Sequence, residues 1–290
     1  MTLQPQSVAT NQPEGEQPVI RVRDLVKTFD RRVLDGVNLD VHKGETMVIM
    51  GGSGCGKSTL LRHLIASLRP DSGGIELFGQ DLIKLDHEQL DNVRRRFGIL
   101  FQSGALFNSM TVGENVALPL REHTSLDDDT IDIMVRIKLE LVGMRHAVHL
   151  MPAELSGGMK KRAGLARAIA LDPEILFYDE PSAGLDPVTS AQIDQLMMDL
   201  AKKLGVTTVV VTHEMDSAFR IADRMAMLDK GRMLKVAPRA EFEAIRDADP
   251  TGDFTNDLIR QFLRGDSTGP LTSRRKNSGY EEDILDAAGM

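Results

Sequence analysis

One short segment has the glycine spacing of a phosphate-binding loop. Residues 51–58 read Gly-Gly-Ser-Gly-Cys-Gly-Lys-Ser and match the pattern G-x-x-x-x-G-K-[ST]. Glycines allow the backbone to wrap closely around a phosphate with its amides pointing inward. We expect Lys57 to reach the β- and γ-phosphates of ATP, and the Ser58 hydroxyl to bind Mg²⁺. The residues predicted to contact nucleotide here are Gly51, Gly52, Ser53, Gly54, Cys55, Gly56, Lys57, Ser58 and Thr59.

Two acidic residues, Asp179 and Glu180, follow the apolar, strand-like segment 175–178. An acidic residue at that position predicts a ligand that helps to hold Mg²⁺, which is the role expected for Asp179. Glu180 is predicted to orient or deprotonate an attacking water. In isolation, an Asp-Glu pair at a strand end commonly faces solvent. The phosphate loop earlier in the chain favours the functional interpretation.

A second anion-binding element is predicted at residues 155–159, which read Leu-Ser-Gly-Gly-Met. Ser156 offers a hydroxyl, and Gly157 and Gly158 offer bare amides, at the start of a predicted helix. Taken alone, this is an ordinary serine-capped helix. Combined with the phosphate loop, it suggests that two copies of the chain sandwich two nucleotides, each copy completing the other's site.

With these motifs in this order, residues 19–236 resemble the ATP-binding-cassette (ABC) ATPase family. The resemblance implies that Gln102 is the glutamine that senses Mg²⁺ and that His213 contacts the γ-phosphate beside Glu180. It implies that Asp186 ends a loop along a dimer interface, and that Phe29 stacks on adenine in place of the more usual tyrosine. As isolated residues, Gln102, His213 and Phe29 would be a surface amide, an ordinary histidine and a core aromatic.

The alternation of strand-like and helix-like segments predicts an α/β domain with a mainly parallel sheet. The resemblance refines this to a P-loop NTPase fold, a nucleotide-binding domain with a mixed sheet, antiparallel N-terminal strands and a helical subdomain that carries the signature. The expected organisation is a disordered leader at 1–18, an ATPase domain at 19–238 with its helical subdomain at about 86–165, a C-terminal helical extension at 239–264, and a flexible tail at 265–290.

Composition narrows the class of protein further. The 290 residues carry a net charge of −8 with a pI near 5.4, which argues against a mainly electrostatic nucleic-acid binder. The single cysteine, Cys55, fits a reducing compartment. No apolar run has the length needed to cross a bilayer, and the polar N-terminus lacks signal-peptide features. We therefore expect a cytoplasmic protein whose membrane role comes through a partner.

Several further stretches resemble one subfamily, the MlaF-type ATPases, also called Mkl or toluene-tolerance type. They are residues 101–108, 115–120, 159–170 and 177–181. The resemblance implies phospholipid or other lipid cargo, an integral membrane permease, an MCE-domain protein, a small STAS-domain protein, and a location on the cytoplasmic face of the inner membrane. The permease would contact residues 102–115.

Some alternatives stay open at this point. The basic run Lys160–Arg162 is either a solvated charged surface or a site for an acidic partner or nucleotide. Phe107 and Met110 either grip a permease helix or belong to the subdomain core. Residues 254–263 have helical apolar spacing and pack on their own domain, a second subunit or a partner.

Two rival functions share the catalytic motifs. One is the ATPase of another transporter, for polar amino-acid import or lipoprotein release. The other is a soluble ABC protein that acts on DNA or ribosomes. The segment between Lys57 and Leu155 is too short for a long coiled coil and shows no heptads, which argues against the chromosome-maintenance type. A single cassette argues against the ribosome-acting type.

Overall fold

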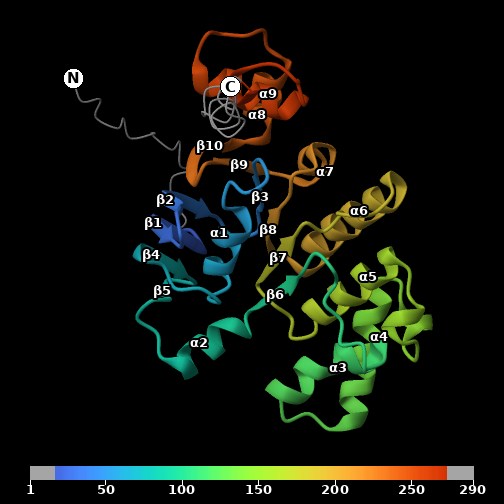
Figure 1. Ribbon diagram of the computed structural model, residues 1–290. Coiled ribbons are helices and arrows are strands. Elements are labelled where there is room, and N and C mark those ends of the chain that lie inside the picture. Colours follow the sequence, from blue (N-terminus) through green and yellow to red (C-terminus); the bar gives the residue numbers. More distant parts are fainter. Residues whose placement is uncertain (1–16, 273–290) are drawn as a thin grey trace, which may run out of the picture. The chain divides into compact units, whose positions relative to one another are not determined.

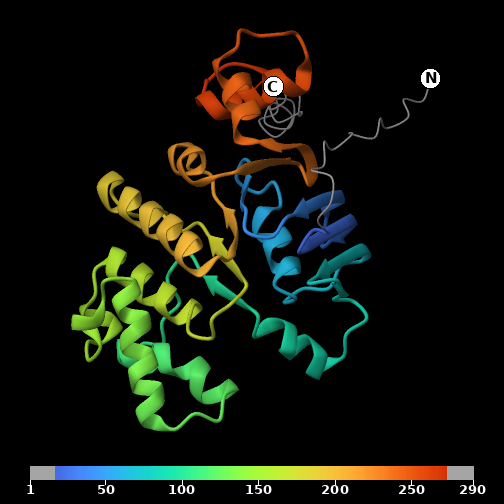
Figure 2. The same ribbon diagram turned by 180° about the vertical axis from the view of Figure 1, so that it is seen from behind.

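A computed structural model describes residues 17–272 of the chain, which separate into one unit that ends at Val236 and another that begins at Ala237 (Figures 1 and 2). The strands are β1 (Ile20–Thr28), β2 (Arg32–Val41), β3 (Thr46–Met50), β4 (Ser72–Leu77), β5 (Gln80–Asp81), β6 (Phe97–Leu100), β7 (Ile175–Asp179), β8 (Thr207–Val211), β9 (Arg224–Asp229) and β10 (Arg232–Pro238). The helices are α1 (Lys57–Leu64), α2 (His87–Arg94), α3 (Val112–His123), α4 (Asp128–Leu141), α5 (Gly157–Ala168), α6 (Pro187–Leu204), α7 (Met215–Ile221), α8 (Arg239–Asp247) and α9 (Phe254–Arg264), with 3-10 turns at Arg145–Ala147 and Pro152–Glu154.

The N-terminal strands form a four-stranded sheet in the order β2-β1-β4-β5, and the neighbouring strands run antiparallel. Alternation along β1 buries Ile20 and Val22, whereas Arg23 faces outward and makes a two-pronged ion pair with Asp40 at 2.7 Å. One face of this sheet therefore covers the core, as is usual for an antiparallel sheet.

The second sheet has six strands in the order β10-β9-β3-β8-β7-β6. Strand β3 runs parallel to β8 and β9, and β7 runs parallel to β8 and β6. Every residue of β8 is buried, which fits a parallel strand covered on both faces. The carboxyl ends of β3, β7 and β8 share one edge, the edge where α/β proteins bind ligands. The predicted α/β fold, with antiparallel N-terminal strands and a mainly parallel sheet, is confirmed.

Helices α3, α4 and α5 gather into one group beyond the β6 end of the large sheet (Figures 1 and 2). The sequence placed the whole stretch 86–165 in a helical subdomain, but residues 97–100 form β6, which pairs in parallel with β7. A four-residue apolar segment with one glycine has no periodicity that separates a strand from a helix, which is why the boundary was wrong. From Val112 to Ala168 the regular elements are helices and 3-10 turns, without a strand.

A buried carboxylate, Asp194, joins α6 to α7. Asp194 has no exposed surface; its Oδ1 accepts a hydrogen bond from Ser217 at 2.6 Å, and Arg220 donates to its Oδ2 at 2.5 Å. Ser182, just after β7, donates to the same Oδ1 at 3.4 Å. One side chain thus holds together three segments that follow β7 and β8.

Replacing Asp194 with alanine is expected to destabilise the fold, because the buried Ser217 hydroxyl and the Arg220 guanidinium would lose their carboxylate acceptor. The expected loss in free energy of unfolding is about 1–3 kcal/mol. The matched control is Asp199→Ala on the same helix, where an exposed carboxylate bonds to Gln195; its effect should stay within about 0.5 kcal/mol. Urea denaturation followed by circular dichroism measures both, and equal midpoints would contradict the assignment.

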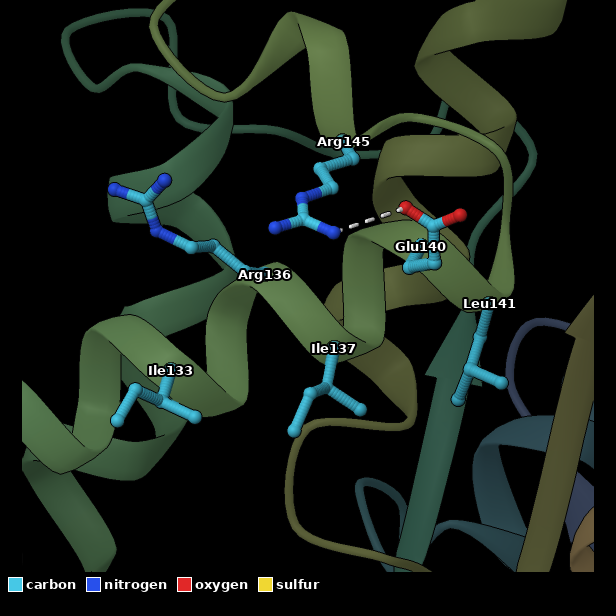
Figure 3. Close-up of a pocket in the computed structure, with 6 residues that line it drawn as sticks. All are labelled: Ile133, Arg136, Ile137, Glu140, Leu141 and Arg145. Atoms are coloured by element: carbon cyan, nitrogen blue, oxygen red, sulfur yellow. Dashed lines mark ion pairs between the residues drawn. The ribbon is translucent and has the colours of Figure 1, made fainter.

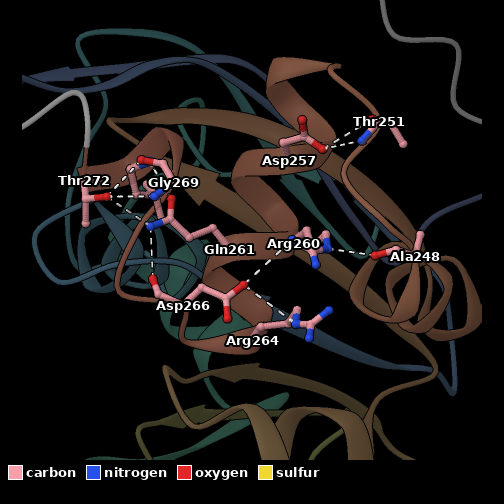
Figure 4. A network of polar contacts seen from close by, with 10 residues as sticks. Ala248, Thr251, Asp257, Arg260, Gln261, Arg264, Asp266, Gly269 and Thr272 are labelled. Atoms are coloured by element: carbon pink, nitrogen blue, oxygen red, sulfur yellow. Dashed lines mark hydrogen bonds and ion pairs between the residues drawn. The ribbon is translucent and has the colours of Figure 1, made fainter.

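The second unit contains α8 and α9. Phe242 of α8 is buried, as are Leu258 and Ile259 of α9, so the apolar side of segment 254–263 packs within this chain. Buried Gln261 donates to Asp266 O at 3.0 Å (Figure 4). It also accepts from the Leu271 amide at 2.7 Å. Residues 265–272, predicted to be part of a flexible tail, are therefore hydrogen-bonded to α9. Most of the predicted leader, residues 1–16, and the rest of the tail, residues 273–290, lie outside the described residues.

Within residues 17–272, no helix combines the length and the apolar composition that crossing a bilayer requires.

Candidate nucleotide-binding site

The phosphate loop between β3 and α1 depends on glycine at two tightly enclosed positions. Gly51 has φ +152°, and a Cβ there would lie 2.1 Å from Leu228 O. Gly56 has φ +113°, and a Cβ there would lie 2.9 Å from Val33 O. Both conformations and both contacts exclude an ordinary side chain. The loop is also fixed from outside, because Cys55 O accepts a hydrogen bond from the Gly231 amide at 2.9 Å.

The end of this loop presents donors to an anion. Gly56 is the N-cap of α1, and among the described residues no side chain caps this helix or places an acid in its first turn. The first amides of α1 are therefore available to a phosphate, which the helix dipole favours. Lys57 donates to Gly51 O at 2.8 Å and to Gly52 O at 3.2 Å, which holds its ammonium against the loop.

The remaining loop residues differ in exposure. Ser53, Gly54 and Ser58 are exposed, whereas Gly52 and Thr59 are half-buried. Cys55 is buried, and burial raises the pKa of its thiol. Its side chain therefore remains a neutral thiol inside the loop. The structure brings all nine predicted loop residues to the carboxyl end of β3.

Asp179 ends β7 at the same edge of the sheet. Its Oδ1 is buried and has no hydrogen-bond partner among the described residues. Burial, and after it the charge of Glu180, raises the pKa of the Asp179 carboxyl, while Arg62, Lys57 and Lys161 counteract this. A buried carboxylate oxygen without a partner is costly, and a bound cation would satisfy it.

This carboxylate and the exposed Ser58 hydroxyl fit Mg²⁺, which takes hard oxygen ligands. Mg²⁺ is commonly held by one or two protein groups together with substrate phosphates rather than by a cage of side chains. Consistent with that, residues 17–272 contain no cluster of three or more His, Cys, Asp or Glu side chains arranged to hold a metal ion.

Glu180 and His213 form a pair across the ends of β7 and β8. His213 Nδ1 lies 2.8 Å from Glu180 Oε2, and the His213 amide donates to the same oxygen at 3.3 Å. Glu180 adopts φ +48°, an uncommon conformation for a residue with a side chain. Its amide donates to Val211 O at 2.9 Å. The structure thus brings together two residues that lie 33 positions apart in the sequence.

Gln102 lies two residues beyond β6, and Leu100 of that strand pairs with Tyr178 of β7. Because β6 runs parallel to β7, Gln102 lies just beyond the same edge of the sheet as Asp179. Its side chain is exposed. Phe29, just after β1, is 54% exposed and lies 5.6 Å from Lys27 Nζ, measured from the ring centroid. An exposed ring can stack on a base, so the interpretation of Phe29 as a core aromatic is wrong.

The second predicted anion site stands apart from the first. Ser156 is exposed and caps α5, accepting from the Met159 amide at 3.3 Å. Gly158 is packed tightly, since a Cβ there would lie 2.8 Å from Thr189 Cγ2. Both views show α5 well separated from the phosphate loop at the start of α1 (Figures 1 and 2). Within one chain, Ser156, Gly157 and Gly158 therefore do not join the loop.

Asp186 caps α6, accepting from the Val188 and Thr189 amides at 3.0 Å each. Its bonds to Thr189 hold the pKa of Asp186 below its usual value. Its carboxylate is thus used to start a helix, and its contact with nucleotide stays a prediction.

A pocket of about 350 Å³ lies elsewhere, on the exposed side of α4 (Figure 3). Ile133, Ile137 and Arg136 line it, with Arg145 paired to Glu140 at its rim. None of the predicted site residues belongs to it. The candidate site is therefore the sheet edge.

Sequence reasoning missed Lys161, whose ammonium donates to Glu180 O at 3.1 Å. Lys161 lies on the same buried side of α5 as Gly158 and Leu165, but this burial comes from tertiary contacts that the sequence alone does not show. The sequence left the basic run open, as either a solvated charged surface or a site for an acidic partner or nucleotide.

Comparisons with known proteins agree with this geometry. The family model described as ABC transporter matches residues 34–183, just over half of the chain. The chain is 40% identical to the intermembrane phospholipid transport system ATP-binding protein MlaF of Haemophilus influenzae, covering 93% of this chain and 99% of that one. It is 42% identical to the probable ribonucleotide transport ATP-binding protein mkl of Mycobacterium leprae, covering 95% and 79%.

Among solved structures, the chain is similar to the ATP-binding cassette MJ0796 in a dimeric post-hydrolysis state bound to ADP and Pi, with a TM-score of 0.70, 30% identity, and coverage of 76% of this chain and 98% of that one. It is also similar to cbiO1 from Clostridium perfringens, part of the ABC transporter complex cbiONQ, with a TM-score of 0.73, 30% identity, and coverage of 80% and 94%. The family match and these relatives show that the chain belongs to the ABC transporter family, as an ATP-hydrolysing subunit.

Proposed function

We propose that this chain hydrolyses ATP to drive the movement of phospholipid or related lipid between membranes, as part of a complex with an integral membrane permease. The observation that best supports this function is the similarity to MlaF, which extends over 93% of this chain and 99% of the Haemophilus protein. A likeness confined to the catalytic motifs would support only the ATPase. This one also covers the stretches outside them, where transporter types differ.

In the proposed mechanism, the phosphate loop and Lys57 would hold the β- and γ-phosphates of ATP. Ser58, Asp179 and Gln102 would hold Mg²⁺, which when bound would supply positive charge beside the transferring phosphoryl group. Glu180 orients a water and accepts its proton as the water oxygen attacks the γ-phosphorus and the bond to the β-phosphate oxygen breaks. The contact of 2.8 Å with His213 keeps the Glu180 carboxylate aimed.

The separation of α5 from the phosphate loop supports a dimer of two copies. Ser156 and Gly158 of one copy would complete the phosphate site of the other, and Ser156 and Gly157 at the start of α5 are exposed. The solved relative MJ0796 is described as dimeric with ADP and Pi. Closure on ATP and reopening after hydrolysis would move the permease.

The permease would dock on residues 102–115. Phe107 is 51% exposed there, on a loop held by its neighbours. Buried Asn115 accepts from the Phe107 amide at 2.7 Å and donates to Phe107 O at 3.1 Å, and Arg167 donates to Ala105 O at 2.8 Å. A fixed aromatic at the surface is a typical anchor for a partner helix. A periplasmic MCE-domain protein and a cytoplasmic STAS-domain protein complete the proposed complex. This chain would bind the permease at the cytoplasmic face of the inner membrane.

Phe107→Ala is expected to weaken stimulation of ATP hydrolysis by the permease and leave the basal rate of the isolated chain unchanged. The loss of a central aromatic corresponds to about a tenfold weaker association, or about 1.4 kcal/mol. A permease titration of ATPase activity measures it. Ile83→Ala, at another exposed apolar residue, is the control. A normal titration with Phe107→Ala would remove this residue from the docking surface.

A second cargo is favoured by the name of the mycobacterial relatives, which are described as probable ribonucleotide transport proteins. Gentle purification of the chain from membranes in detergent, followed by mass spectrometry of co-purifying proteins and small molecules, separates the two. An MCE-domain protein, a permease and enriched phospholipid would support the proposal. Ribonucleotide enrichment without lipid, or a solute-binding protein, would overturn the lipid cargo and leave the ATPase intact. Recovery with ribosomes or DNA would overturn the transporter role.

A further inference from the structure

The basic run at the start of α5 is not a uniform solvated surface. Lys161 is only 4% exposed, and Arg162 donates to Val142 O at 3.1 Å. Lys160 is half-buried. Of the two interpretations left open for this run, the solvated charged surface is therefore wrong for Lys161, whose side chain is enclosed by the protein.

Lys161 points at the predicted catalytic glutamate. Its Nζ donates to Glu180 O at 3.1 Å. Burial lowers the pKa of Lys161, whereas the nearby charges of Glu180, Glu214 and Asp179 raise it. An enclosed ammonium is costly unless it has acceptors and opposite charges around it, and here both come from the end of β7 and the residues after β8.

The carbonyl that Lys161 contacts belongs to a residue with an unusual backbone. Glu180 has φ +48°, a left-handed conformation that is unfavourable for a residue with a side chain. Such a conformation persists only where the surroundings fix it. Its amide donates to Val211 O at 2.9 Å, and its carbonyl also accepts from the Ala183 amide at 3.2 Å. Lys161 supplies the contact that comes from the helical segment.

We propose that Lys161 is a positioning residue that fixes the backbone of Glu180 in its own chain, so that the helix completing one ATP site with Ser156 also aims the base of the other. The role of α5 in two ATP sites rests on the proposed shared-site dimer. The positioning of Glu180 by Lys161 rests on the contact within one chain. The signature helix then joins two ATP sites physically, through five residues of α5 and its cap.

Lys161→Met keeps the length of the side chain and removes the charge and the donor. The expected result is a kcat for ATP lowered by about 10- to 100-fold, the range for a misplaced catalytic group, with the KM for ATP changed less than about twofold, since the loop that binds ATP is untouched. Lys161→Arg, which keeps a charged donor, should recover most of kcat. Lys160→Met is the matched control. A kcat loss shared equally by Lys160→Met, or a KM change that accounts for the loss, would overturn the proposal.

Mixed dimers test whether Lys161 acts within its own chain. Ser156→Arg blocks the signature, so a Lys161→Met chain mixed with a Ser156→Arg chain should regain hydrolysis at one intact site. A Lys161→Met chain mixed with a Lys57→Ala chain should not. The reverse pattern would show that Lys161 serves the partner's site and would overturn the proposal. Mixing Lys57→Ala with Ser156→Arg is the positive control: its failure would reject the shared-site dimer, and the kcat and KM measurements would then decide the role of Lys161 alone.

Discussion

Glu180→Gln is expected to bind ATP normally and to hydrolyse it about 10²- to 10⁴-fold more slowly, the range for loss of a general base. Glutamine has the same shape, so the contact of 2.8 Å with His213 can remain, but a neutral amide accepts no proton from water. ATP should therefore hold two copies together. Release of phosphate measures turnover, and size-exclusion chromatography with and without ATP measures the dimer.

The control for this change is Glu174→Gln, which lies just before the opposite end of β7. Glu174 pairs with Arg96 at 2.6 Å, away from the carboxyl edge of the sheet. It makes the same chemical change next to the same strand, at an exposed ion pair that contributes little, and should leave turnover within about twofold. Near-normal hydrolysis by Glu180→Gln would refute the role given to Glu180.

Lys57→Ala and Ser156→Arg are each expected to abolish hydrolysis, and a mixture of the two variants is expected to restore it. In a two-fold symmetric dimer, each site takes its phosphate loop from one copy and its signature from the other, so the mixed dimer has one intact site. Random pairing then gives about a quarter of the unmodified activity. The ATPase rate of the mixture against each variant alone is the measurement.

A mixture of Lys57→Ala with a chain that carries both changes is the control, because no pairing in it assembles an intact site. Thermal denaturation of each variant shows whether the chain is folded. If the first mixture stays inactive while both variants are folded and dimeric, the sharing of sites between copies is wrong.

The phosphate loop and the residues after β7 could be predicted because their chemistry is local. Gly51, Lys57 and Asp179 each belong to a short pattern whose spacing is set by one loop or one strand end. The α/β fold followed from alternating apolar segments. These signals need no knowledge of which segments meet in space.

Other features could not be predicted because they depend on tertiary contacts. The segment 97–100 is a strand only because β7 pairs with it. The burial of Lys161 depends on the end of β7, which lies 19 residues away in sequence at Glu180. Glutamine is usually a surface residue, yet Gln261 is buried and bonded to residues that follow α9. The type and spacing of side chains in the sequence do not show which distant residues they will contact.

The outside support of the phosphate loop has a consequence for how the protein is made. The Gly231 amide bonds to Cys55 O, and β3 lies between β8 and β9, so the loop rests on residues made long after it. Contacts between segments so distant in sequence form late, because chain closure must precede them. An emerging chain that stops short of β9 carries the complete motif without its supporting frame. Nucleotide would therefore stabilise finished molecules in preference to partly synthesised ones.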